Sequence, residues 1–471
     1  MTETSESDVL TVDKLPETHV PVVIVGAGAC GLVAALAARD ARAEVLVLER
    51  DTLPRGSTAM SSGLIPAAAT RWQQALEVTD SPDLMASDIQ HKNHNEADPV
   101  IVQMVTQRSA KTLHWLADRH GVEFSLVTGF LYPGHSALRM HGTPRRTGDE
   151  LMGALTNAAE RAGIDILCEA RVDTILVTHS GTVCGVRVSR PDGSSEEIGC
   201  DAVILACSGF GGHAEMVKRY MPAMDAAVYY GHAGNQGDAL RWGARLGAQA
   251  LDLASYQGHG SLAWPHQTLI TWSVMMMGGI QINSLGERFS NEHEGYSEQA
   301  RLVLAQPDGI AWNIFDHRIH DAAMEFEDYR QAWSAGAVQK ADSVEALAGL
   351  MRVPADTLSE TIGQTWALCD QGGVDSMGRR FQTDQRLTSP FYAIRVTGAL
   401  FHTQGGLAVD PEAKVLSANG QPIPGLYAGG GAARGVSGSG DSGYLSGNGL
   451  LAAVMLGATA GESAARQTLD K

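Results

Sequence analysis

The chain has 471 residues, of which 44% are hydrophobic and 53 are glycine, and this composition is typical of a large α/β enzyme with many tight turns. Its formal net charge of −18 and its lack of a dense basic run argue against a nucleic-acid partner, because binding to a phosphate backbone depends on Lys and Arg. No segment has the roughly 18 apolar residues that a membrane span needs, so we expect no membrane span.

The N-terminal segment, residues 1–18, is polar and acidic and has neither a signal-peptide core nor a twin-Arg start. The six cysteines have no CxxC spacing, and most lie in apolar runs where free thiols serve as small hydrophobic residues. A reducing compartment is the simplest setting for such cysteines. We therefore expect a flexible tail over residues 1–18, no bound metal and a cytoplasmic location.

The first predicted element after this tail is a βαβ unit with a glycine-rich turn. An apolar strand over residues 20–25 runs into Gly26-x-Gly28-x-x-Gly31, and a helical stretch and a second strand follow, ending in Glu49. The glycines allow a tight turn and the close approach of a pyrophosphate to the helix N-terminus, while the carboxylate can bind a ribose hydroxyl. The unit predicts a dinucleotide site for either FAD or NAD.

Four further segments follow in chain order. Residues 55–63, RGSTAMSSG, form a loop of small residues that lets the backbone and hydroxyls approach a planar ring system. Residues 171–188 are expected to form a hairpin, and residues 202–212 begin as a buried strand and end in small residues. The last of the four, residues 278–292, reads GGIQINSLGERFSNE.

A second glycine-rich stretch lies near the C-terminus, over residues 425–453. It is bounded by a strand-like GLYA and a helix-like LLAAVMLGATA, and flexible linkers seldom sit so tightly between core elements. We interpret the two glycine-rich loops as two walls of one cofactor site.

In this order the segments resemble the flavoprotein superfamily of fumarate reductase, succinate dehydrogenase and 3-ketosteroid Δ1-dehydrogenase, and the resemblance covers nearly the whole chain. It implies an α/β fold in which a Rossmann-like FAD domain of the glutathione-reductase type carries an inserted α+β cap, the catalytic domain. The FAD domain is then expected over residues 19–253 and 383–471, and the cap over residues 254–382. The resemblance decides the cofactor in favour of FAD.

The same resemblance assigns the residues that would bind FAD. The loop after the second strand lacks the His that members with covalently attached FAD carry there, so we expect non-covalent FAD. Gly431 replaces the usual acidic residue of the C-terminal loop, so one ribityl contact is missing or made by backbone. The implied FAD-binding residues are Gly26, Gly28, Ala29, Gly31, Glu49 and Arg50, then Ser57, Thr58, Ser61, Gly63, Val172, Ser208 and Gly209, and at the C-terminal end Gly405, Gly406, Gly430, Ser446, Asn448, Gly449 and Leu450.

The catalytic positions separate the members of the superfamily. Fumarate reductases protonate their substrate through an Arg relay, which includes an Arg four residues after the Glu of an RF-x-NE motif. At that spacing from Glu292 this chain has Tyr296, and it reads GYLSGN, with Tyr444, where a fumarate reductase reads NRLGGN. The two phenols resemble the ketosteroid dehydrogenases, in which one Tyr takes the α proton and another polarises the ketone with help from a backbone N–H.

Two histidines resemble the substrate-binding pair of fumarate reductases: His402 in FHTQGGL and His259 in YQGHGS. A pocket with both phenols and histidines suits a ketone and a carboxylate, as a 4-oxocyclohexanecarboxylate desaturase requires. Tyr132 is a candidate third phenol. Arg434 and Asp441 share the C-terminal loop and point either at substrate or at solvent, whereas Arg288 and Glu292 are expected to support the cap.

The sequence therefore predicts an FAD-dependent desaturase that oxidises the Cα–Cβ bond next to a ring ketone. The favoured substrate is a small oxocycloalkane carboxylate such as 4-oxocyclohexanecarboxylate, and the electron acceptor is oxygen, a quinone or a carrier protein. Three alternatives stay open: an enoate reductase of the fumarate or urocanate type, a 3-ketosteroid Δ1-dehydrogenase, and a flavoprotein subunit that relays electrons to a partner.

Overall fold

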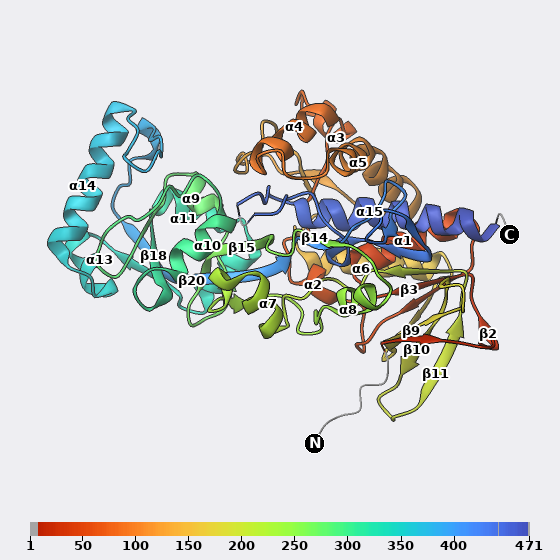
Figure 1. Cartoon of the computed structure of the whole chain (residues 1–471). Coiled ribbons are helices and arrows are strands. Elements are labelled where there is room, and N and C mark those ends of the chain that lie inside the picture. Colours follow the sequence, from red (N-terminus) through yellow and green to blue (C-terminus); the bar gives the residue numbers. More distant parts are fainter. Residues whose placement is uncertain (1–7, 441, 470–471) are drawn as a thin grey trace, which may run out of the picture.

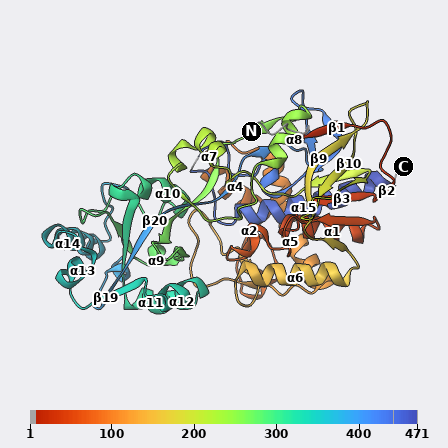
Figure 2. The ribbon, with the colours of Figure 1, turned by 90° about the horizontal axis from the view of Figure 1, so that it is seen from below.

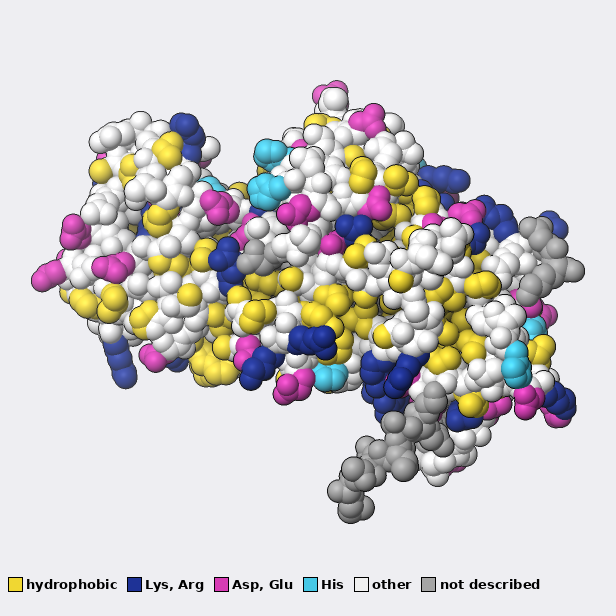
Figure 3. Space-filling model, viewed as in Figure 1, with side chains coloured by type: hydrophobic (Ala, Val, Ile, Leu, Met, Phe, Trp, Pro, Cys, Tyr) yellow, Lys and Arg dark blue, Asp and Glu magenta, His cyan; other side chains and the backbone are white. Residues whose placement is uncertain are grey.

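The computed structural model describes residues 8–440 and 442–469. The chain forms two lobes, a larger one that contains both ends of the described chain and a smaller one built from its middle (Figure 1). On the face shown in Figure 3, hydrophobic side chains gather where the two lobes meet. None of the described helices is long and apolar enough to cross a membrane.

The larger lobe is built on a six-stranded sheet in the order β22-β23-β12-β3-β4-β8. Its strands pair in parallel except for β22 with β23, and β3 has every side chain buried, as expected for a strand covered on both faces. The expected βαβ unit is therefore confirmed. The strands are β3 (Val22–Val25), β4 (Val45–Leu48), β8 (Asp165–Leu167), β12 (Ala202–Leu205), β22 (Lys414–Leu416) and β23 (Pro422–Ala428).

Helices from both ends of the chain cover this sheet, and α1 packs along α15. The two helices lie close because glycines of α15 face backbone of α1: a Cβ on Gly457 would lie 2.5 Å from the carbonyl oxygen of Cys30. The fold thus brings the two glycine-rich loops, which precede these helices, to one place. The helices of this lobe are α1 (Ala29–Asp40), α2 (Gly56–Ala59), α3 (Arg71–Ala75), α4 (Pro82–Lys92), α5 (Pro99–His120), α6 (Gly148–Arg161), α8 (Asp238–Arg245) and α15 (Asn448–Leu469).

A five-stranded sheet in the order β1-β9-β10-β11-β2 lies beside the first. Its middle contains the hairpin expected over residues 171–188, formed by β9 and β10. We expected residues 1–18 to form a flexible tail, but strand β1 and the first residue of β2 lie in that range. They form because the edges of β9 and β11 offer backbone partners to β1 and β2. The strands are β1 (Val9–Thr11), β2 (Thr18–His19), β9 (Arg171–Val177), β10 (Val183–Ser189) and β11 (Ser195–Gly199).

The smaller lobe contains a mixed sheet in the order β16-β15-β20-β18-β17, with β13 and β19 also paired to β20. Its long central strand begins after residue 383, where the second part of the FAD domain was expected, and instead pairs with β15 and β18 of this lobe. The expected domain boundary at residue 383 therefore assigns this strand to the FAD domain, whereas the structure has it in the sheet of the smaller lobe. The strands are β13 (Val228–Tyr229), β15 (Tyr256–Ala263), β16 (Thr268–Leu269), β17 (Ile280–Ile282), β18 (Ile310–Asp316), β19 (Val338–Ala341) and β20 (Phe391–Thr403).

Helices pack on this sheet and extend the lobe outward to α13 and α14 (Figure 2). Both helices end at a residue in the left-handed region, which for α14 is Gly372, with φ of 62°. The helices are α9 (Ser273–Met276), α10 (Tyr296–Leu304), α11 (His317–Ala323), α12 (Glu327–Ser334), α13 (Val344–Met351) and α14 (Ala355–Gln371).

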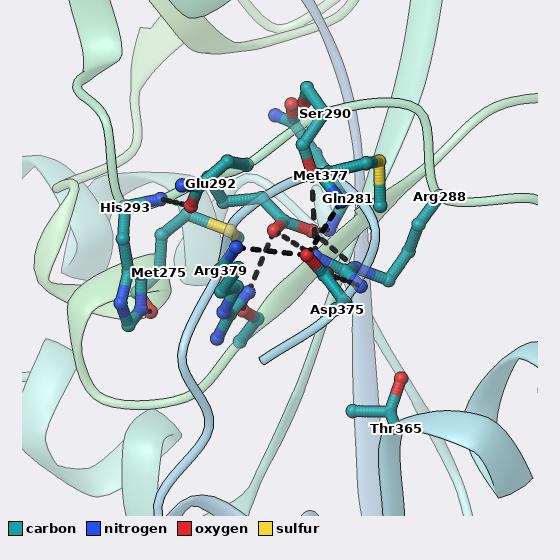
Figure 4. A network of polar contacts seen from close by, with 12 residues as sticks. Met275, Gln281, Arg288, Ser290, Glu292, His293, Thr365, Asp375, Met377 and Arg379 are labelled. Carbon is teal, nitrogen blue, oxygen red and sulfur yellow. Dashed lines mark hydrogen bonds and ion pairs between the residues drawn. The ribbon is translucent and has the colours of Figure 1, made fainter. Parts of the chain in front are cut away.

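A buried ion network ties the loops of the smaller lobe together (Figure 4). Glu292 accepts hydrogen bonds from Arg288 at 2.6 Å, from Arg379 at 2.9 Å and from the N–H of Gln281 at 2.9 Å, and Asp375 pairs with Arg288 at 2.7 Å. Burial raises the pKa of Glu292, but the charges of Arg379 and Arg288 outweigh it and hold the pKa at about 2. We infer that Arg288 and Glu292 support the lobe, since neither lines a cavity described below.

Candidate active site

A cavity of the larger lobe opens at the start of α1, where the sequence predicted a dinucleotide site. Gly26 has φ of 103°, and a Cβ there would lie 2.6 Å from the carbonyl oxygen of Ala206, while a Cβ on Gly31 would overlap the carbonyl oxygen of Gly26. Only glycine fits at either position. The turn therefore carries α1 directly to the cavity, so that its N-terminal N–H groups can meet a pyrophosphate.

Glu49 directly follows β4 and lines this cavity with its side chain buried. Its two carboxylate oxygens accept hydrogen bonds from the N–H groups of Ala27 at 2.9 Å and Asp51 at 3.0 Å, which fix its orientation. Lone pairs remain on both oxygens for a ribose hydroxyl. The predicted residues that line this cavity are Gly26, Gly28, Ala29, Glu49, Arg50, Ser57, Thr58, Val172, Ser208 and Gly430.

A second cavity continues the first toward the smaller lobe, and five residues line both: Ser57, Thr58, Ser208, Gly431 and Ala453. The position of Gly431 also explains why the usual acidic residue is absent there. A Cβ at this glycine would lie 2.9 Å from the backbone nitrogen of Gly209, so a longer side chain does not fit. The predicted flavin residues Ser61, Gly63, Ser446, Gly449 and Leu450 line the second cavity.

Five predicted cofactor residues do not line either cavity: Gly31, Gly209, Gly405, Gly406 and Asn448. They lie behind the walls. Gly406 packs so closely that a Cβ would lie 2.5 Å from the backbone of Ala433, and the Asn448 side chain donates to the Ser437 hydroxyl at 3.1 Å. The resemblance implied all of these residues alike, and the structure separates those that line a cavity from those that pack the loops.

The two predicted phenols lie together in the second cavity, although 148 positions separate them. Their ring centroids are 6.1 Å apart, with an interplanar angle of 61°. Tyr296 begins α10 of the smaller lobe, and Tyr444 lies in the loop before α15 of the larger lobe. Their hydroxyls lie close enough to affect each other's pKa, and the N–H groups of Gly447 and Gly449 favour the phenolate of Tyr444. The pair spans the junction of the two lobes.

Burial controls the protonation of these phenols. It raises the pKa of Tyr296 to about 12. Ser446, Tyr444 and the N–H of Gly447 act in the opposite direction, because hydrogen bonds from them favour the phenolate. Burial and the neighbouring Tyr296 raise the pKa of Tyr444 well above its usual value, and the same two causes raise that of Tyr132. All three are therefore neutral near pH 7 and can donate hydrogen bonds. Tyr132, the candidate third phenol, does line the second cavity.

Both predicted histidines line the same cavity. His259 stacks on Tyr296 with centroids 4.9 Å apart, and its Nδ1 accepts from the N–H of Ser261 at 3.1 Å, so the proton of the neutral ring is on Nε2. Burial lowers the pKa of His259 to about 3 and also lowers that of His402. His402 lies edge-on to Tyr444, with centroids 5.9 Å apart, and its Nε2 lies against Gly449. Both rings are neutral hydrogen-bonding groups.

The charge of the second cavity is unusual for a site expected to hold a carboxylate. Among the residues that the structure describes, its lining includes one charged side chain, Asp328, and no Lys or Arg. Arg434 faces away and bonds Asp252 at 2.5 Å, while Asp441 lies outside the described residues. Sequence reasoning missed much of the wall. Six of the missed residues lie in segments or motifs that the sequence singled out: Met60, Ser62, Gln257, Phe401, Gly447 and Ala453. The others missed are Leu64, Met140, Tyr230, Leu269, Thr271, Trp272, Phe326 and Asp328.

This chain is similar to curated flavoprotein reductases. The family described as "FAD binding domain" matches residues 21–450. A fumarate reductase (cytochrome) of Shewanella frigidimarina is 30% identical over 456 residues, which cover 96% of this chain and 78% of the relative. A urocanate reductase of Eggerthella lenta is 26% identical, over 88% of this chain and 70% of the relative.

Solved structures agree with the fold. The open conformation of a flavocytochrome c3 fumarate reductase superposes with a TM-score of 0.81 at 28% identity, covering 97% of this chain and 79% of that one. A 3-ketosteroid Δ4-(5α)-dehydrogenase from Rhodococcus jostii RHA1, in complex with 4-androstene-3,17-dione, gives 0.77 at 24% identity, covering 98% and 99%. The expected fold and FAD cofactor are confirmed. The chain belongs to the FAD binding domain family and is an FAD-dependent oxidoreductase of the class that acts on CH–CH and C=C bonds.

Proposed function

We propose that the protein is a dehydrogenase that removes hydrogen across the Cα–Cβ bond next to a ring ketone. The observation that carries this proposal is the pair of phenols, Tyr296 and Tyr444, beside the N–H groups of Gly447 and Gly449. Donors that converge on one spot in a buried cavity suit an oxygen that gains negative charge during reaction. A ketone oxygen gains such charge when its α proton leaves.

The side chains divide the reaction between them. The Tyr444 hydroxyl and the N–H of Gly449 donate hydrogen bonds to the substrate carbonyl oxygen, which makes the α proton more acidic. Tyr296, as the phenolate, takes that proton onto its oxygen, with Ser446 and the N–H of Gly447 stabilising the charge. FAD, when bound, supplies the hydride acceptor for the β carbon. Loss of one proton and one hydride leaves the enone as product.

The charge of the cavity limits the choice of substrate. The sequence favoured a ring ketone with a carboxylate, but no Lys or Arg among the described lining residues is available to bind one. The two histidines are neutral, because burial lowers the pKa of each. We therefore propose a ring ketone without a carboxylate, and retain 4-oxocyclohexanecarboxylate as the compound that tests this restriction.

Enoate reduction is the second candidate, with the same cavity working in the opposite direction. The names of the relatives favour it, since they are fumarate and urocanate reductases, and so does the position of His259 and His402 in the cavity lining. The lack of a cation beside these histidines disfavours a dicarboxylate. We also propose that FAD is held without a covalent bond, because the 55–63 loop contains no His, Cys or Tyr.

Anaerobic mixing of the FAD-loaded protein with candidate substrates distinguishes these functions. Cyclohexanone, a 3-ketosteroid, 4-oxocyclohexanecarboxylate and succinate are added in turn while the flavin absorbance is followed. Bleaching by an uncharged ring ketone supports the proposal. In the reverse arm, protein reduced with dithionite is mixed with fumarate or urocanate. If these reoxidise the flavin and no ketone bleaches it, the protein is an enoate reductase and the proposal is wrong.

A further inference from the structure

Asp328 is the feature of the second cavity that the proposed reaction does not use. It lies in the first turn of α12, a helix that packs on β16 along the outside of the smaller lobe (Figure 2). Tyr230, Leu269, Phe326 and Phe401 line the same cavity. None of them lines the dinucleotide cavity, and the residues shared by the two cavities all belong to the larger lobe. Asp328 is thus on a wall of the second cavity that the dinucleotide cavity does not share.

The carboxylate of Asp328 lacks a partner within the described parts of the chain, since no hydrogen bond or ion pair holds it. Burial and the adjacent Glu327 raise its pKa to about 6. Asp328 also acts on Tyr230: burial is the larger cause that raises the pKa of Tyr230, and the negative charge of Asp328 is the smaller one. A half-buried carboxylate without an opposite charge beside it loses hydration that no ion pair offsets, so a ligand group that pairs with it gains free energy.

The surrounding wall gives this charge a defined place in the cavity. Phe326, two residues before it, packs edge-on against Phe130 across the junction of the lobes, with centroids 6.1 Å apart. Tyr230 packs on Phe401 with centroids 5.1 Å apart. A substrate whose carbonyl meets Tyr444 would therefore lie between aromatic side chains and present its other end to the Asp328 wall.

We infer that Asp328 selects the substrate by charge at the end distant from the reacting carbonyl. It favours ring ketones that carry an ammonium or a hydroxyl group there and excludes those that carry a carboxylate. This inference rests on the proposed function for the position of the carbonyl. It adds a specificity-determining residue, and it predicts that this chain rejects dicarboxylates although it is similar to a fumarate reductase.

Binding of phenols without turnover tests the inference separately from the reaction. Phenols resemble the enol form of a ring ketone and cannot be dehydrogenated in the same way. The FAD-loaded protein is titrated at pH 8 with 4-(aminomethyl)phenol, 4-methylphenol and 4-hydroxybenzoate, and the dissociation constants are taken from the change in flavin absorbance. We expect the ammonium compound to bind at least about tenfold more tightly than the carboxylate.

The D328N variant keeps the shape of the side chain and removes its charge, so the ratio of the two dissociation constants should fall about tenfold. E327Q is the matched control, because Glu327 is on the same helix and does not line the cavity; its ratio should stay within about twofold of the parent protein. An unchanged ratio in D328N, or no binding of the ammonium compound to the parent protein, overturns the inference. Failure of every ketone to bleach the flavin, with the binding preference intact, overturns only the proposed function.

Discussion

Two buried polar clusters of the smaller lobe differ in how their groups are paired. Around Glu292, two arginines and a second carboxylate compensate one another, and each charge has a partner within 3 Å. Around Tyr296, the described lining residues include no Lys or Arg. Only hydrogen bonds from neutral groups oppose the rise in the pKa of Tyr296 that burial causes. The RF-x-NE motif and Tyr296 are only a few residues apart, so one segment of chain serves both clusters.

We propose that this difference separates a structural cluster from a reactive one. In the Glu292 network the pKa of Glu292 is lowered and that of Arg288 is raised, so both groups stay ionised near neutral pH. In the phenol cluster the pKa values are raised, so that protons are held where a substrate can reach them. Four predictions test whether the clusters have these separate tasks.

The largest effect is expected from removing a phenol hydroxyl. Y296F should lower kcat by about 10³-fold and Y444F by about 10²- to 10³-fold, because each removes a proton-transfer or oxyanion-stabilising group. Both variants should keep their FAD, which the absorbance spectrum measures. Y427F is the control, since that buried hydroxyl bonds Gln467 at 2.7 Å away from the site. Near-normal turnover in both variants would contradict the assigned roles.

The paired cluster should respond in stability rather than in chemistry. E292Q leaves Arg288 and Arg379 without their shared partner, which should cost about 3–5 kcal/mol of unfolding free energy. Thermal unfolding of the FAD-loaded protein measures the loss. E345Q, on the surface of α13, should leave the melting temperature unchanged. A normal melting temperature in E292Q, together with lost turnover, would place Glu292 in the reactive cluster instead.

The pH dependence of turnover should follow Tyr296. Since its pKa is about 12 and only the phenolate accepts the α proton, kcat should rise about tenfold per pH unit from pH 7 to pH 10. Stopped-flow rates of flavin bleaching in a series of buffers give the profile. Y132F should keep this slope, whereas Y296F should lose it. A plateau below pH 9 in the parent protein would show that another group takes the proton.

The smallest effect is expected from His259. Its pKa is lowered to about 3 by burial, so protonation begins only in strong acid, and kcat for an uncharged ketone should show no break from this group between pH 5 and 8. H259Q should therefore change KM without changing the shape of the profile. A break near pH 6.5 that disappears in H259Q would mean that the ring is hydrated and charged, and the cavity more polar than described.

The sequence was most predictive where the chemistry is local. The turn at Gly26 and Gly31 and the position of Glu49 follow from spacing, because sterics within one βαβ unit decide them. The meeting of Tyr296 with Tyr444 came from resemblance alone, since nothing in the spacing of residues 148 apart implies contact. Their neighbourhood in the structure agrees with that expectation.

The parts that could not be predicted depend on tertiary pairing. Asp328 stands in an ordinary amphipathic helix, and only the packing of α12 on β16 brings it to the cavity. Gly405 and Gly406 stand in a motif that is typical of cofactor-binding glycines, but each packs against the backbone of another loop. Those loops are distant in the sequence, so the sequence alone does not predict the contacts. The strand Val9–Thr11 forms because β9 has an open edge, a property of the sheet rather than of the three residues.

The strand β20 has a practical consequence for anyone who exchanges parts between relatives. It begins as the central strand of the smaller lobe's sheet and runs to Thr403, so the same continuous backbone also carries His402 into the cavity. A graft that replaces residues 254–382 alone would divide this sheet and join a foreign lobe to a native strand. A workable chimera must transplant residues 391–403 as well, together with Val228 and Tyr229, which pair with that strand.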